Sequence, residues 1–103
     1  MKNKPLRLKL KVVWFENFLG FAVDQLSIEQ KYALTPYYFW PKTKAWEQLK
    51  AELDSKLWLA DNDKIKILKT TSEVMNYWLS NRDKETIRDL SEKFGYVEFI
   101  NSK

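Results

Sequence analysis

The feature that most constrains this chain is an alternation of apolar and basic residues near its beginning. Apolar residues fall on one side of the pattern (Leu6, Leu8, Leu10, Val12, Trp14) and basic residues on the other (Arg7, Lys9, Lys11). A sustained period of two predicts a half-buried β-strand. Because Val13 and Phe15 make the second face apolar too, we expect something to cover that end of the strand.

Two further strands are predicted from the following residues. Residues 19–26 read as a strand that returns after a turn at 16–18, so a β-hairpin is the simplest connection. Residues 27–36 read as a loop ending at Pro36. Tyr37–Trp40 then fits a short third strand that Pro41 stops, and three strands reach the minimum size for a stable sheet.

The second half of the chain has helical periodicity. A first helix is expected after Thr43 as N-cap, with Trp46, Leu49, Leu53 and Leu57 on one side. A second is expected from Asp61 or Asn62 to about Ser80 or Asn81. A third amphipathic segment begins at Arg82, carries Ile87, Leu90 and Phe94, and ends at Gly95. Residues 96–100 are either a last short strand or an extended tail.

Together these segments predict a single α+β domain over residues 1–103. We expect a small antiparallel sheet, made of the N-terminal hairpin and a short third strand, covered on one face by two to three C-terminal helices. The residues expected to be largely buried are Trp14, Phe21, Val23, Phe39, Trp46, Leu49, Leu53, Leu68, Met75 and Trp78.

The composition argues against catalysis. The chain contains no Cys and no His, which removes disulfides, thiolate metal sites, and the commonest general base and metal ligand. An acid–base pair of carboxylates is the remaining option, but no spacing brackets the candidates as a pair (Asp24, Glu47, Glu52, Glu73). We expect no cofactor, no metal and no small-molecule substrate. We also expect no membrane partner, because the apolar runs are too short to span a bilayer.

Positive charge is concentrated at the beginning of the chain. The net charge is +4, and residues 1–11 contain no acidic residue but five basic ones, Lys2, Lys4, Arg7, Lys9 and Lys11. On a strand, the last three would be about 7 Å apart, close to the phosphate spacing of a single nucleic-acid strand. This pattern fits docking onto a polyanion and an ordinary solvated face equally well. Lys42 and Lys44, in the turn after Trp40, are further candidates.

The aromatic run at 37–40 allows two interpretations. On a strand, Tyr37 and Phe39 point one way and Tyr38 and Trp40 the other. Exposed aromatics beside lysines can stack nucleobases, whereas aromatics in small domains more often belong to the core. We interpret the run mainly as a strand-to-helix core junction.

Several longer stretches resemble a known family when they are taken together. They are VVWFEN at 12–17, FAVDQ at 21–25, LTPYYFWPKTKAWEQLKAELDSKLWL at 34–59 and ILKTTSEVMNYWLS at 67–80. In this combination the chain resembles the plastid-specific small-subunit ribosomal protein of the third type, found in chloroplasts, algal plastids and cyanobacteria. The resemblance covers about residues 6–80, so we take residues 1–80 as a family-like core and residues 81–103 as a C-terminal extension of helix and tail.

The resemblance implies a non-catalytic component of the small ribosomal subunit, located in the chloroplast stroma or, for a cyanobacterial source, in the cytoplasm. The implied partners are small-subunit ribosomal RNA and neighbouring ribosomal proteins, and we expect a monomer off the ribosome. Charge alone selects the candidate RNA-binding residues: Lys2, Lys4, Arg7, Lys9, Lys11, Lys42 and Lys44. The alternative is a protein-interaction adapter that uses an aromatic surface without direct RNA contact.

Overall fold

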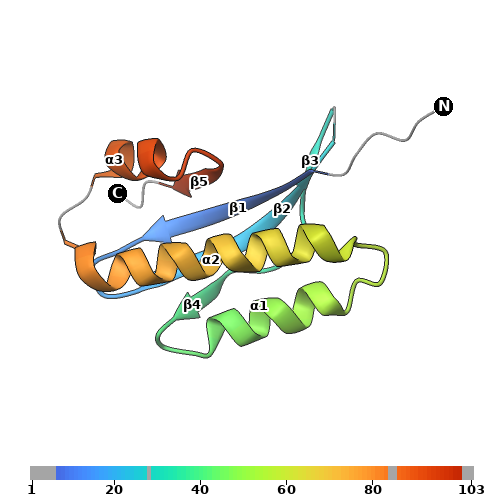
Figure 1. Cartoon of the computed structure of the whole chain (residues 1–103), viewed down its shortest axis with the longest axis horizontal. Coiled ribbons are helices and arrows are strands. Elements are labelled where there is room, and N and C mark those ends of the chain that lie inside the picture. Colours follow the sequence, from blue (N-terminus) through green and yellow to red (C-terminus); the bar gives the residue numbers. More distant parts are fainter. Residues whose placement is uncertain (1–6, 28, 84–85, 101–103) are drawn as a thin grey trace.

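The described part of the computed structural model, residues 7–27, 29–83 and 86–100, consists of strands followed by helices and one returning strand. The elements in chain order are β1 (Arg7–Trp14), β2 (Leu19–Leu26), β3 (Lys31–Ala33), β4 (Tyr38–Trp40), α1 (Ala45–Asp54), α2 (Asp61–Asn81), α3 (Ile87–Lys93) and β5 (Val97–Ile100). The predicted α+β class is confirmed (Figure 1). Lys2 and Lys4 lie outside the described residues.

The sheet is built around the predicted hairpin. β1 and β2 pair antiparallel from Arg7 opposite Leu26 to Trp14 opposite Leu19. β3 and β4 both pair with β2, and β5 pairs with β1 on the other side. β5 runs parallel to β1, so the sheet is mixed. A parallel pairing needs a long crossover connection, and here the three helices lie between β4 and β5 in the chain. β3 lies in the segment expected to be a loop.

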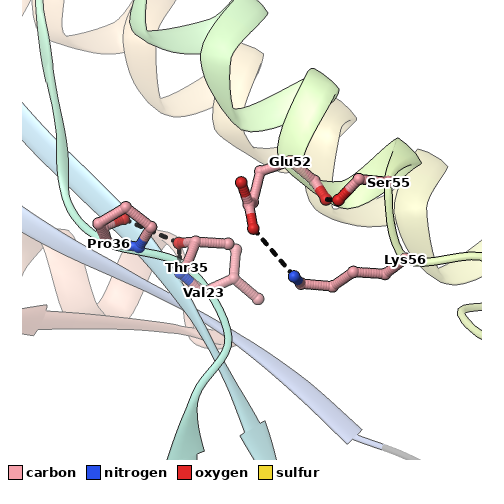
Figure 2. Close-up of polar contacts among 6 residues, drawn as sticks. All are labelled: Val23, Thr35, Pro36, Glu52, Ser55 and Lys56. Carbon is pink, nitrogen blue, oxygen red and sulfur yellow. Dashed lines mark hydrogen bonds and ion pairs between the residues drawn. The ribbon is translucent and has the colours of Figure 1, made fainter.

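The edge of the sheet is interrupted between β3 and β4, and Thr35 satisfies the backbone there. The amides of Leu34 and Thr35 both donate to the carbonyl oxygen of Val23, at 2.9 and 3.2 Å. The Thr35 hydroxyl accepts from the Val23 amide at 3.1 Å and donates to the Pro36 carbonyl at 2.8 Å (Figure 2). This arrangement resembles a bulge, in which a side chain replaces the missing strand partner. Pairing then resumes at Tyr38.

The helices cover one face of the sheet. α2 packs on β1 and β2, α1 packs on β4 and α2, and α3 packs on β5 (Figure 1). Lys56, two residues beyond the end of α1, forms an ion pair with Glu52 of that helix at 2.9 Å (Figure 2). Tyr38 packs against the core on the helix side of β4, where burial, followed by the charge of Glu52, raises its pKa. No helix in the described ranges is long and apolar enough to cross a membrane.

Most of the predicted core is found beneath these helices. The side chains of Trp14, Phe21, Val23, Leu49, Leu53, Leu68 and Trp78 are buried. Trp46 and Met75 are half-buried and pack against the core.

Besides the strand at 31–33, the parallel β5 and the start of α3 at Ile87 instead of Arg82, three expectations about single residues were wrong. Phe39 is 40% exposed, because it is Tyr38 and Trp40 that point toward the helices. Leu57 is 89% exposed, because α1 ends at Asp54 and does not reach it. The N-cap of α1 is Lys44, not Thr43, whose hydroxyl instead donates to the carbonyl oxygen of Phe39 at 2.9 Å.

Two tryptophans connect the C-terminal end of α2 to the turn end of the β1–β2 hairpin by side-chain hydrogen bonds. The indole N–H of Trp78 donates to the carbonyl oxygen of Phe15 at 2.7 Å. The indole N–H of Trp14 donates in the opposite direction, to the carbonyl oxygen of Arg82 at 3.1 Å. Each ring is also buried, so each tryptophan combines a large apolar contact with a satisfied polar group.

Trp78 is therefore expected to dominate stability. Trp78→Ala should lower the free energy of unfolding by about 3–5 kcal/mol, since it removes a fully buried ring and leaves a cavity. Trp58→Ala, at a side chain that is 56% exposed, should change it by less than about 0.5 kcal/mol. Urea unfolding followed by circular dichroism measures both, and equal losses in the two variants would contradict the assignment.

Candidate functional site on the open face of the sheet

The second face of the sheet lies opposite the helices, and we call it the open face. It carries Arg7, Lys9, Lys11, Val13 and Phe15 from β1 and the residue that follows it, and Gly20, Ala22, Asp24 and Leu26 from β2. The helices pack on the other side, where Leu10, Val12 and Trp14 join the core. The alternation in the sequence thus separates a core face from a face available for contacts.

An ion pair in the middle of the open face fixes one of the predicted basic residues. Lys11 Nζ lies 2.9 Å from Asp24 Oδ1, and the side chains are only 18% and 3% exposed. Burial alone would lower the pKa of Lys11, but the hydrogen bond to Asp24, with the charges of Tyr37, Asp24 and Glu98, raises it overall. The charge of Lys11 is therefore used to neutralise a buried carboxylate.

Arg7 and Lys9 lie on the same face and supply its available positive charge. Arg7 is exposed and Lys9 half-buried, and neither forms an ion pair with another of the described residues. Lys31 and Glu98 form a longer, exposed ion pair at 3.8 Å, which is weak in water. The three predicted basic residues of β1 are thus brought together, but only two of them are available to a ligand.

Lys42 and Lys44 are exposed at the other end of the sheet. The turn that carries them follows β4, whose last residue, Trp40, pairs with Leu19 near the end of β1. Along β1 that end is about 23 Å from Arg7, at roughly 3.3 Å per residue. The structure therefore divides the predicted basic residues into two separate groups.

Beside the charged residues, four aromatic rings form a cluster on the open face. Tyr37 and Phe39 are nearly parallel, with an interplanar angle of 22° and centroids 6.2 Å apart. The centroid of the Phe18 ring lies 5.7 Å from that of Phe39 and 4.3 Å from that of Phe15. The ammonium of Lys11 lies 5.3 Å from the centroid of the Tyr37 ring, within cation–π range. We refer to Phe15, Phe18, Tyr37 and Phe39 as the aromatic cluster.

Gly20 explains how Phe39 lies. The two residues are cross-strand partners, and a Cβ atom on Gly20 would lie only 2.6 Å from Phe39 Cε1. The ring therefore lies close against the glycine backbone, and the residue is 40% exposed. Sequence reasoning missed this cluster, although a glycine inside a predicted strand is a signal for close approach of another group.

The four candidate carboxylates lie on three elements, Asp24 on β2, Glu47 and Glu52 on α1, and Glu73 on α2. Asp24 is paired with Lys11, Glu52 is paired with Lys56, and Glu73 accepts a hydrogen bond from the Tyr96 hydroxyl at 3.5 Å. Within residues 7–27, 29–83 and 86–100, no cluster of three or more His, Cys, Asp or Glu side chains could hold a metal ion. The described residues of the open face present basic side chains and aromatic rings, which are the groups that proteins use to bind nucleic acids.

A small α+β domain with cations and aromatic rings on one face of its sheet has the features of a binding module, and comparison with known proteins identifies its family. Residues 34–81 match the model of the family described as plastid and cyanobacterial ribosomal protein (PSRP-3 / Ycf65). The chain is 42% identical over 88 residues to a probable small ribosomal subunit protein cS23 of Synechococcus sp. (strain JA-3-3Ab), covering 85% of this chain and 89% of that protein.

Two algal relatives agree. The small ribosomal subunit protein cS23 of Gracilaria tenuistipitata var. liui is 38% identical over 93% of this chain and 97% of its own length. That of Cyanidium caldarium is 45% identical over 82% of each chain. The chain belongs to this plastid and cyanobacterial ribosomal protein family, which agrees with the expected location. Because the match to the Gracilaria protein covers 93% of this chain, it extends past residue 80 into the segment that we set apart as a C-terminal extension.

The ion pair on the open face yields a test of stability. Lys11→Met should lower the free energy of unfolding by about 3 kcal/mol, because it leaves the buried Asp24 carboxylate unpaired. Since folding raises the pKa of Lys11 above 10.5, the pair contributes fully at neutral pH and is lost only as the pH rises through that raised value.

The control is Lys9→Met, on the same strand face: Lys9 lies opposite Asp24 in the register, but the ion pair of Asp24 is with Lys11, so the change should be less than about 1 kcal/mol. The double variant Lys11→Met/Asp24→Leu should recover most of the loss, since no buried charge remains. Chemical unfolding at pH 7 measures all three. A Lys11→Met protein as stable as Lys9→Met would refute the role of the pair.

Proposed function

We propose that this protein is a non-catalytic component of the small ribosomal subunit in plastid or cyanobacterial translation. It docks on ribosomal RNA and neighbouring proteins through the basic side of β1, and it is a monomer off the ribosome. The relatives named as small ribosomal subunit proteins support the assembly. The observation that carries the docking surface is the presence of Arg7 and Lys9 on the open face, unpaired among the described residues.

The basic residues act on the RNA backbone in this proposal. Arg7 and Lys9 neutralise phosphates and release bound counterions, a contribution that does not depend on base sequence. Lys2 and Lys4 precede them in the chain and extend the same positive segment. Lys11 has a different part, since it holds Asp24 and supports the face from within.

Lys42 and Lys44 form a second contact region. They are exposed in the turn between β4 and α1, about 23 Å along the sheet from Arg7 at roughly 3.3 Å per residue. A single phosphate group cannot reach both groups of cations. The two groups therefore contact different parts of the RNA, which fixes the orientation of the domain as well as its affinity.

A non-catalytic role is proposed from the chemistry of the side chains. The chain lacks His and Cys, and three of the four carboxylates considered as acid–base candidates, Asp24, Glu52 and Glu73, take part in ion pairs or a hydrogen bond. The available functional groups are lysines, arginines and aromatic rings. These suit assembly with a polyanion.

Contact with a neighbouring protein has its own observation in favour. Leu57 and Trp58, in the connection between α1 and α2, are 89% and 56% exposed. Adjacent exposed apolar side chains of this size favour a protein contact. If this contact alone held the protein in place, as in the adapter alternative, its association would be indifferent to salt and to ribonuclease.

Loss of the available charges should weaken association with the subunit. The double variant Arg7→Gln/Lys9→Gln should bind small subunits more weakly and with less salt dependence, each lost phosphate contact lowering the log–log salt slope by up to about one unit. Co-sedimentation with salt-washed small subunits over a range of salt concentrations measures both quantities.

A matched control removes the same charge elsewhere. Lys50→Gln/Lys69→Gln changes two exposed lysines on α1 and α2, away from the open face, and should leave the salt slope unchanged. If the Arg7→Gln/Lys9→Gln protein co-sediments like the wild type at every salt concentration, the proposed docking face is wrong.

A further inference from the structure

We propose that Phe39, with Tyr37 and Phe18 beside it, is a stacking site for an unpaired nucleobase of single-stranded RNA. In this arrangement the base lies on the exposed side of the Phe39 ring. The phosphates of the adjoining nucleotides run along β1 toward Lys9 and Arg7. The site thus adds a contact to bases where the cations alone contact the backbone.

The geometry of Phe39 is that of a prepared platform. A Cβ atom on Gly20 would lie only 2.6 Å from Cε1 and 2.9 Å from Cδ1 of Phe39, so this part of the ring lies close against the glycine backbone, while the residue remains 40% exposed. The hydroxyl and amide of Thr43 both hold the Phe39 carbonyl oxygen, at 2.9 and 3.0 Å. The rings of Phe39 and Phe18 make a T-shaped contact, with centroids 5.7 Å apart and an interplanar angle of 81°. A rigid ring costs little ordering entropy when a base stacks on it.

The charge beside the platform is complementary to RNA. Among described residues of the open face, Arg7, Lys9, Lys11 and Lys31 are opposed only by Asp24 and Glu98, which leaves an excess of positive charge. Phe39 pairs with Gly20 and Gly20 pairs with Val13, so Phe39 and Val13 lie at the same position along the strands. Along β1 it is therefore about 13 Å from Lys9, at roughly 3.3 Å per residue. That span corresponds to about two phosphate spacings of an extended single strand, taken as near 7 Å.

A single strand fits this surface better than a duplex or a peptide. Bases in a duplex are stacked on each other and cannot lie on a protein ring, whereas splayed bases can. Two grooves among the described residues, of about 440 and 520 Å³, lie on the helix side. Residues of α2 and Tyr96 line both, with Leu8 and Leu10 of β1 in the first and Lys93 and Phe94 in the second, and these grooves would suit a peptide better than the open face does.

This inference rests on the proposed function, since it places a base of the RNA on the same face as the proposed phosphate contacts. Its test uses the full chain and a fluorescein-labelled oligouridine of about twelve nucleotides, a length within the usual site sizes for single strands. Fluorescence anisotropy measures the affinity at several salt concentrations. Co-sedimentation with small subunits is measured in parallel.

Phe39→Leu should weaken oligouridine binding by roughly 5- to 100-fold, the loss of one stacked base. The salt slope should stay unchanged, because no phosphate contact is removed. Phe39→Tyr should retain the wild-type affinity, since it keeps the ring. Tyr32→Leu is the control, because Tyr32 is also exposed, at 50%, but lies on the helix side of the sheet, opposite Gln25, and it should bind like the wild type.

Three results would overturn the inference while the proposed function stands. They are equal oligouridine affinities for Phe39→Leu and wild type, equally tight binding of a duplex RNA, and loss of subunit association by Phe39→Leu without loss of oligouridine binding. The last would show that Phe39 contacts a protein. Failure of the wild type to associate with small subunits at low salt would instead overturn the proposed function, and this inference with it.

Discussion

The hydrogen bonds that Trp14 and Trp78 exchange between the hairpin and α2 are the interaction on which the rest of the structure depends. Each indole N–H reaches a backbone carbonyl beyond the end of the other element, at 3.1 and 2.7 Å. Because both rings are buried on one side of the sheet, they hold α2 against that side. Burial of that face provides most of the apolar stabilisation, and the opposite face is left open for contacts.

The open face combines two requirements that compete in a small domain. It must keep the sheet stable without a second layer of helices, and it must present groups to a partner. Lys11 serves the first requirement by neutralising Asp24, and the aromatic cluster covers Gly20 and the apolar end of β1. Arg7 and Lys9 serve the second. The exposed side of Phe39 contributes to both, since a ring that covers backbone can also stack with a base.

Local sequence patterns predicted much of this fold, while the long-range pairings could not be read from them. Alternation identified β1, and periodicity identified the bounds of α2. The side on which Phe39 lies depends on its pairing with Gly20, beyond an interruption at Thr35. The basic face was predicted from charge, but the ion pair of Lys11 depends on the hairpin register, which alternation alone does not specify. The parallel pairing of β5 likewise follows from packing across most of the chain.

The central claim is that the open face of the sheet is the side of this protein that meets RNA. A cryo-electron microscopy map of a plastid or cyanobacterial small subunit that contains the protein tests it most directly. The account predicts phosphates within hydrogen-bonding distance of Arg7 and Lys9, an unpaired base on Phe39, and α1 and α2 on the side away from this RNA. A map with the helices against the RNA and the open face toward solvent or another protein would contradict it.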